Sequence, residues 1–213
     1  MRYSPEHKAA SREALIKAAA RVFREKGYAG VGVDQVADAA GVTSGSFYKH
    51  FTGKSQVLLE VARAGIDRVA RRIRTLRASP TADPLGGWVN DFASLHTSKA
   101  HLKATGLGCN LPTLTVEVAR ADAAVKAAYQ ESLLRGVAAM LEAPPLAGEP
   151  DGPARGLAML AVLSGGAAMA RAVADEETAD RIAEAVRRAC LLIAANRLPD
   201  TPRSGVVWTP AEY

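Results

Sequence analysis

The segment 33–51, VDQVADAAGVTSGSFYKHF, constrains the fold of this 213-residue chain more than any other. Its first half carries apolar residues at the i, i+3, i+4, i+7 spacing of a short helix with one buried face. These residues are Val33, Val36, Ala37 and Ala40. Gly41 follows directly, where a glycine adopts the left-handed conformation that ends a helix. The segment therefore predicts a short helix and a tight turn.

A second helix is expected to begin at once, because Thr43 or Ser44 offers a side-chain oxygen that caps a helix. Phe47 and Phe51 then lie four residues apart on one side of this helix. The opposite side presents small, hydroxylated and basic residues: Ser44, Gly45, Tyr48 and Lys49. Two short helices of this kind predict a helix-turn-helix with its recognition helix second.

These residues resemble the DNA-binding end of the TetR family of bacterial transcription regulators. The resemblance runs from a first helix ending in EKGY, through VDQVADAAGV, to SGSFYKHF and the GKSQVLLEV that follows. One position departs from the family pattern. Gly32 stands where these regulators usually have Ser or Thr, a residue that caps the helix and touches a phosphate. Since glycine is a tolerated N-cap, the helix is still expected, with one phosphate contact fewer.

The motif also gives a set of expected DNA contacts. A helix that enters a major groove needs small residues for close approach and donors for base edges. The residues expected at or near base edges are Thr43, Ser44, Gly45 and Lys49. The resemblance implies phosphate contacts for Tyr48, His50 and Lys54.

Positive charge is concentrated in the same part of the chain. Residues 1–77 contain 15 Lys and Arg against 7 Asp and Glu, a net charge of +8, although the whole chain carries only +5. A merely solvated surface is the alternative, but coincidence with the motif favours attraction to a polyanion. Arg2, Lys8 and Arg12 form either an arm along the DNA or a frayed terminus.

The remaining segments also show helical periodicity, and no run alternates with the period of a strand, so the expected fold is all-α. The clearest helices are expected at 11–26, 55–78, 154–174 and 176–197, with Asn110 and Asp122 as further N-caps and a mobile loop at 143–153. We expect a three-helix helix-turn-helix domain at 1–54, a connecting helix at 55–78, a helical effector-binding and dimerisation domain at 79–198 and a tail at 199–213.

The segment 55–78 is expected to link the two regions mechanically, because a helix of this length spans about 35 Å. Its last turns carry a run of arginines, among them Arg68 and Arg72. Positive charge is favourable at the negative end of the helix dipole, and we prefer this explanation of the run to a second DNA contact.

The last two expected helices are more apolar than one buried face requires, and 156–170 reads GLAMLAVLSGGAAMA. This surplus predicts a partner chain. The resemblance implies a homodimer in which these helices form a four-helix bundle with those of a second subunit. A two-fold dimer reads a near-palindromic operator in double-stranded DNA.

The resemblance further implies a repressor that releases DNA when a small-molecule effector binds in the second domain. The pattern suggests candidate pocket-wall residues, although ordinary core is the favoured interpretation of each: Trp88, Phe92, His96, Tyr129, Met140 and Met159. A cavity of this composition would suit a hydrophobic drug, an acyl chain or an aromatic metabolite.

Cys109 is a separate candidate for effector sensing. It lies in a glycine-flanked break before a helix that Asn110 is expected to cap, and a helix N-terminus lowers the pKa of a thiol. A thiol-based redox or electrophile sensor is therefore one alternative, and a buried small hydrophobe is the other. Cys190 lies in an apolar run and is expected to be core or interface.

Other function classes lack their signatures. The two cysteines and four histidines are dispersed, which predicts no disulfide framework and no metal site. No nucleotide-binding or hydrolase motif is present, so we expect neither enzyme activity nor a cofactor. The sequence also predicts no signal peptide and no membrane span, hence a cytoplasmic protein. A helical protein-interaction module without DNA binding is the remaining alternative.

Overall fold

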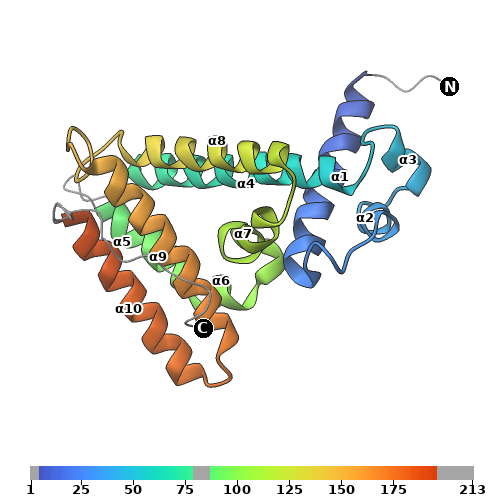
Figure 1. Ribbon diagram of the computed structural model, residues 1–213. Coiled ribbons are helices and arrows are strands. Elements are labelled where there is room, and N and C mark those ends of the chain that lie inside the picture. The colour runs from blue at the N-terminus through green and yellow to red at the C-terminus, as the bar shows by residue number, and fades with distance from the viewer. Residues whose placement is uncertain (1–4, 79–86, 196–213) are drawn as a thin grey trace, which may run out of the picture.

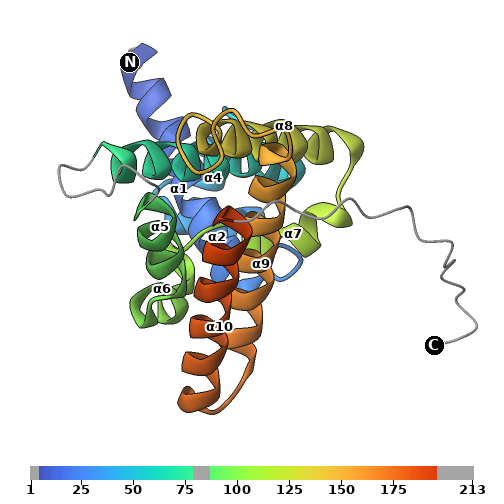
Figure 2. The ribbon, with the colours of Figure 1, turned by 90° about the vertical axis from the view of Figure 1, so that its left-hand side faces the viewer.

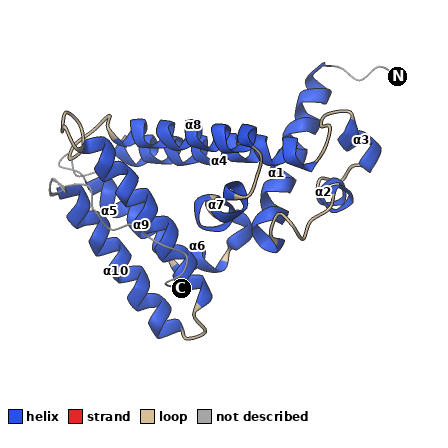
Figure 3. Cartoon of the chain, viewed as in Figure 1, coloured by secondary structure: helices blue, strands red, loops and turns tan. Residues whose placement is uncertain are grey.

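The computed structural model describes residues 5–78 and 87–195, and this part of the chain contains helices and loops but no strand (Figures 1 and 3). The all-α prediction is confirmed. The helices are α1 Pro5–Lys26, α2 Val33–Ala39, α3 Ser44–Tyr48, α4 Lys54–Arg77, α5 Gly87–Thr97, α6 Lys99–Lys103, the 3-10 helix η1 Thr105–Leu107, α7 Leu111–Ala119, α8 Ala123–Met140, α9 Gly152–Ala172 and α10 Glu176–Ala195.

Helices α4 and α8 run side by side across the molecule and connect its two ends (Figures 1 and 2). Helices α1 to α3 form one end. Helices α5, α9 and α10 form the other, and α7 lies between the two (Figure 1). The long α4 is thus the link that the sequence predicts, since 24 residues of helix span about 36 Å.

The N-terminal end is built as its local sequence dictates. Gly41 has a φ of +70°, the left-handed conformation that ends α2, and Thr43 caps α3 by accepting a hydrogen bond from the Ser46 N–H at 3.2 Å. Gly32 has no side chain to cap α2, but its N–H donates to Gln35 Oε1 at 2.8 Å. Phe47 is fully buried, which fixes the opposite side of α3 toward solvent.

Two hydrophobic clusters form the core, and α4 contributes to both. Val57 and Leu58 belong to the cluster beneath the helix-turn-helix, whereas Val69 and Ile73 belong to the cluster with α5, α8, α9 and α10. The first cluster also contains Leu114 of α7. Part of the expected second domain therefore packs directly on the first, and the expected domain boundaries stay a prediction.

Several details differ from the expectations. Helix α1 begins at Pro5 rather than at residue 11, and α6 and η1 were not anticipated. Asp122 caps α8 by accepting from the Val125 N–H at 2.9 Å, as expected. The loop 143–153, expected to be mobile, is anchored by the fully buried Leu146. Arg2 and the tail at 199–213 lie outside the described residues.

Helix α9 requires a correction to the expectation that no segment has the composition of a membrane span. Among the described helices, α9 alone is long and apolar enough to cross a membrane by length and composition, with a mean hydropathy of 1.2. Such a composition is also typical of a core helix, and 44% of this stretch is buried against the rest of the chain.

Candidate nucleic-acid interface and ligand cavity

The exposed side of α3 brings together most of the residues expected to contact DNA. Tyr48 is 60% exposed, and Thr43, Gly45 and Lys49 are also exposed. Ser44 is half-buried because its Oγ donates a hydrogen bond to Asp34 Oδ1 of α2 at 2.5 Å. This bond fixes α3 on α2, so the recognition helix and its support form one rigid unit.

Lys54 is used differently from the expected phosphate contact. Its Nζ donates to the carbonyl oxygens of Tyr28 at 2.8 Å and Val31 at 2.9 Å, and it lies 4.2 Å from the centre of the Tyr28 ring. Two of its three donors thus hold the turn after α1 against the start of α4. Lys54 is a positioning residue in this structure, and a phosphate contact through its third donor stays a prediction.

His50 is half-buried beside Phe51, and its buried Nδ1 has no hydrogen-bond partner among the described residues. Burial is the main cause that lowers the pKa of His50, and the charges of Lys8 and Arg12 lower it further. Its imidazole is therefore neutral at pH 7 and can offer a phosphate a hydrogen bond but no charge. Arg12 itself forms an ion pair with Glu60 of α4 at 2.9 Å.

A cavity of about 120 Å³ lies beside α4, between this helix and the residues that run from the end of α5 through α6 and η1 to the start of α7. Its lining comprises Gly65, Arg68, Val69, Arg72, Leu95, His96, His101, Leu107, Gly108, Cys109 and Asn110. A narrow crevice shares His96, His101 and Cys109 with it and continues to the apolar side chains of Phe92, Leu111, Leu160 and Leu163. The two hollows form one candidate site with a polar mouth and an apolar interior.

A larger hollow of about 290 Å³ lies between α6 and the turn from α9 to α10. Two exposed ion pairs bridge its walls, Lys99 with Asp180 at 2.9 Å and Lys103 with Glu176 at 2.7 Å. Among the described residues, none that lines this hollow has a hydrogen bond to the helix-turn-helix, so we consider the cavity beside α4 the better effector site.

The expected pocket residues separate into three groups. Phe92, His96 and Cys109 lie at the cavity or its crevice. Tyr129 lines a separate void of about 10 Å³ and bonds the Thr115 hydroxyl at 2.9 Å. The other three, which line none of these hollows and are at most 2% exposed, are Trp88, Met140 and Met159. Periodicity identifies the buried face of a helix but does not distinguish closed core from cavity wall.

Sequence reasoning missed four polar residues of the site: Arg68, Arg72, His101 and Asn110. The sequence predicts a helix-dipole role for the two arginines and a capping role for Asn110, and it gives His101 no separate role. The one available signal was the i, i+4 spacing of the two arginines, which places them on the same side of α4.

A buried arginine connects this cavity to the helix-turn-helix. Arg24 of α1 is 7% exposed; its Nη1 donates to Asn110 Oδ1 at 2.6 Å and its Nε to the Gly106 carbonyl at 3.1 Å. Asn110 in turn donates from Nδ2 to the Val61 carbonyl of α4 at 3.0 Å. Burial lowers the pKa of Arg24 to about 10, so the guanidinium remains charged at pH 7.

The sequence suggested that Asn110 caps α7, and this prediction is wrong. Asn110 occupies the N-cap position, but its side chain makes no capping hydrogen bond, because both ends of the amide bind Arg24 and Val61. A Cβ at Gly65 would overlap this amide, so the close approach of α4 requires glycine there. We refer to Arg24, Gly106, Asn110 and Val61 as the Arg24 latch.

The acidity of the Cys109 thiol fits the buried-hydrophobe alternative rather than the sensor alternative. Burial raises its pKa above the usual value, and this outweighs the opposing effects of the Leu111 N–H, 3.5 Å from Sγ, and of Arg24. A raised pKa leaves less thiolate at neutral pH, so the structure gives no support to an activated sensor thiol.

We accordingly expect Cys109 of the folded protein to react with iodoacetamide at pH 7.5 at least about tenfold more slowly than free cysteine. Its rate should still be rising at pH 9, because the thiolate forms only above the usual pKa. Mass spectrometry on a Cys190→Ser variant would follow this residue alone, with denatured protein as the reference. Rapid alkylation that levels off below pH 8 would restore the sensor hypothesis.

Residues 15–61 match a family model described as bacterial regulatory proteins, tetR family. Among curated relatives, the HTH-type transcriptional repressor KstR2 of Mycobacterium tuberculosis is 39% identical over 71 residues, 33% of this chain and 35% of that protein. The regulator LmrA of Bacillus subtilis is 35% identical over 78 residues, 36% of this chain and 41% of that protein. The chain thus matches only about two-fifths or less of the length of these two relatives.

Solved structures match over more of the chain. The reduced form of NemR from E. coli superposes with a TM-score of 0.69 at 17% identity, covering 85% of this chain and 95% of that one. A regulatory protein TetR from Rhodobacter sphaeroides gives a TM-score of 0.64 at 22% identity, covering 84% of this chain and 97% of that one. At these identities the likeness establishes a shared fold for the helical body as well as for the N-terminal end.

Proposed function

We propose that this chain, which belongs to the TetR family of bacterial regulatory proteins by its N-terminal domain, is a transcriptional repressor that a small-molecule effector releases from DNA. The observation that carries the proposal is the Arg24 latch, because it joins the wall of the ligand cavity to α1 of the helix-turn-helix. The relatives KstR2 and DhaR are described as repressors, which supports repression rather than activation. The relative FasR is described as an activator.

DNA is bound through α3, which enters the major groove with its exposed side. Thr43, Gly45 and Lys49 reach base edges, and Tyr48 reaches a phosphate. Their exposure and the net charge of +8 on residues 1–77 support this arrangement. Since the protein acts on bacterial DNA, its place of action is the cytoplasm.

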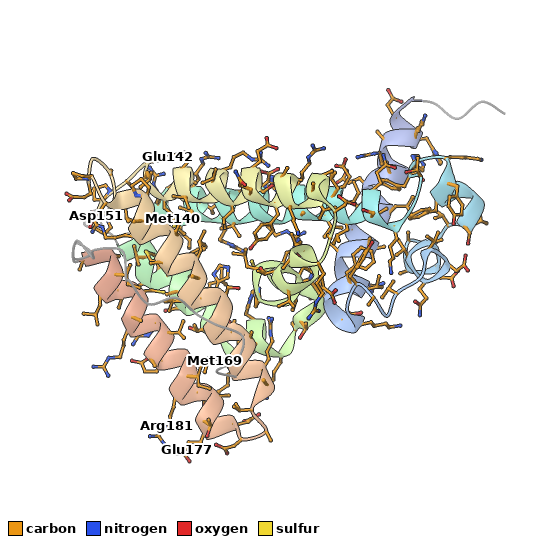
Figure 4. All side chains as sticks on the ribbon, viewed as in Figure 1. Met140, Glu142, Asp151, Met169, Glu177 and Arg181 are labelled. Carbon is orange, nitrogen blue, oxygen red and sulfur yellow. The ribbon has the colours of Figure 1, made fainter. Side chains whose placement is uncertain are left out.

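The functional unit is a homodimer formed through α9 and α10. Helix α9 exposes small and apolar residues at every fourth position: Leu157, Ala161, Gly165 and Met169. Met169 is 61% exposed, and a Cβ at Gly165 would meet nothing within 4 Å, so another helix can approach closely here. Figure 4 shows Met169 close to the turn that joins the two helices. A two-fold dimer of this kind reads a near-palindromic operator.

Release follows from the contacts of the cavity wall. An effector that binds one position of Asn110 more tightly than another shifts the population of chains toward that position. Because Arg24 binds the same amide, α1 and the recognition helix follow, and the spacing between the two recognition helices of the dimer changes. Coupling of this kind is typically about 1–3 kcal/mol, enough for a five- to 150-fold change in operator affinity.

The DNA-binding part of the proposal is tested with Lys49→Ala. Loss of this exposed lysine should reduce the slope of log affinity against log salt by about one charge. Fluorescence anisotropy on a palindromic duplex selected from random sequence, and on a random duplex, would measure it. The control is Lys126→Ala, which removes an exposed lysine from α8 and should leave the slope unchanged.

Two results would contradict the assignment. A Lys49→Ala slope equal to that of the unmodified protein would remove Lys49 from the interface. If the unmodified protein showed no salt-dependent retention on any duplex, a helical protein-interaction module would become the better description.

Lys54→Ala should instead lower the free energy of unfolding, because two carbonyl groups lose their donor.

A further inference from the structure

We propose that the effector is a small organic carboxylate, whose anionic group faces Arg68 and Arg72 and whose short apolar part faces Val69 and Leu95 of the same cavity. The regulatory role of this molecule rests on the proposed function, but its binding to the cavity does not. The inference differs from the apolar cavity with few charges that the sequence suggested.

The charge at the mouth of the cavity is not paired with a carboxylate among the described residues. Arg68 and Arg72 both line the cavity, and neither has a hydrogen bond or ion pair with another described residue. By contrast, Arg74 and Arg77 on the same helix both bind Glu142, at 2.7 and 2.8 Å. No acidic residue is among those that line the cavity. Two adjacent guanidinium groups without a carboxylate are suited to bind one.

The histidines inside the cavity add hydrogen-bonding groups without cancelling this charge. The rings of His96 and His101 lie 5.1 Å apart, and His96 Nδ1 is bonded to the Phe92 carbonyl at 2.8 Å. The buried Nε2 of His101 has no partner among the described residues. Burial lowers the pKa of both rings, that of His101 to about 4, so both are neutral at pH 7. An oxygen of the ligand would satisfy His101.

The size of the hollow limits the apolar part of the ligand. Its volume of about 120 Å³ is slightly smaller than the ~150 Å³ cavity that accommodates benzene in another protein. The crevice beyond it is lined by Phe92, Leu111 and Leu163 but adds only about 10 Å³. A short branched chain, or at most one ring whose carboxylate stays at the open mouth, is therefore the upper limit for the ligand, and a long acyl chain does not fit.

The test compares acids with their uncharged amides on the full-length protein. Calorimetric titration would use benzoate against benzamide, phenylacetate against phenylacetamide, and butyrate against butyramide. We expect at least one acid to bind about tenfold or more tightly than its amide, as a charge-assisted hydrogen bond predicts. Arg68→Gln combined with Arg72→Gln should remove this preference. Arg71→Gln, an exposed arginine of α4 that does not line the cavity, is the matched control.

Three outcomes would overturn the inference: no acid binds at millimolar concentration, an amide binds as well as its acid, or the control variant loses the preference too. Because Arg68 and Arg72 are exposed, thermal melting should show that the double variant folds normally. Operator binding is measured separately. An acid that binds without changing operator affinity would disprove gating and leave the ligand class standing. If only a neutral compound released the protein from DNA, gating would stand and the proposed ligand class would be wrong.

Discussion

Replacing Arg24 with methionine should destabilise the fold and break the link between ligand and DNA binding. Methionine keeps much of the apolar stem but leaves the Gly106 carbonyl and the Asn110 Oδ1 without their donor inside the protein. Each buried unpaired group costs about 1–3 kcal/mol, so the free energy of unfolding in urea should fall by about 2–5 kcal/mol. Arg21→Met, an exposed change on the same helix, should have little effect.

The effect on coupling separates this residue from an ordinary stabilising contact. In the unmodified protein the best-binding acid should weaken operator binding. In Arg24→Met we expect the same acid to weaken it by less than about twofold, which is below the usual allosteric range. Ligand binding itself should persist, because Arg24 does not line the cavity, but its affinity should change because Asn110 of the cavity wall loses its partner. Fluorescence anisotropy and calorimetry at a temperature where the variant is folded would measure both. A variant in which the acid keeps its full effect would show that coupling takes another route.

The helix-turn-helix was predictable because its determinants are local. Gly41 ends α2 through its own backbone conformation, and Thr43 caps α3 through an N–H three residues away. The long α4 was equally clear from its uninterrupted apolar stripe, and the last two helices were clear from their length and apolar composition. In each of these segments, propensity, periodicity and capping indicate the same structure.

The candidate site was only partly predictable, because its determinants are distant in sequence. Asn110 has the local signature of an N-cap, yet Arg24, 86 positions away, binds its side chain. Lys54 looks like a free basic residue beside the recognition helix, yet the carbonyls of the α1–α2 turn bind its ammonium group. Cys109 shows the same limit, because desolvation by packed neighbours outweighs the helix N-terminus in setting its pKa. Local patterns do not contain these tertiary contacts.

A negative charge in the proposed dimer interface should have the largest effect on operator binding. Ala161→Glu places a carboxylate on the small-residue stripe of α9, where two subunits would bury it without a partner. Ala161 is exposed in the single chain, so the subunit itself should still fold. A monomer presents one recognition helix instead of two, and the loss of avidity should weaken operator binding by at least about 100-fold.

Ala127→Glu supplies the matched control, because Ala127 is an exposed alanine in the second turn of α8 and away from the proposed interface. Sedimentation velocity at micromolar concentration should show dimers for the unmodified protein and the control, and monomers for Ala161→Glu. Circular dichroism should show equal helix content in all three, which would assign the lost DNA affinity to assembly rather than to unfolding. If the unmodified protein sediments as a monomer yet binds the palindromic duplex tightly, the two-fold arrangement is wrong. The operator would then be read by single subunits, and control by the spacing of two recognition helices would no longer be possible.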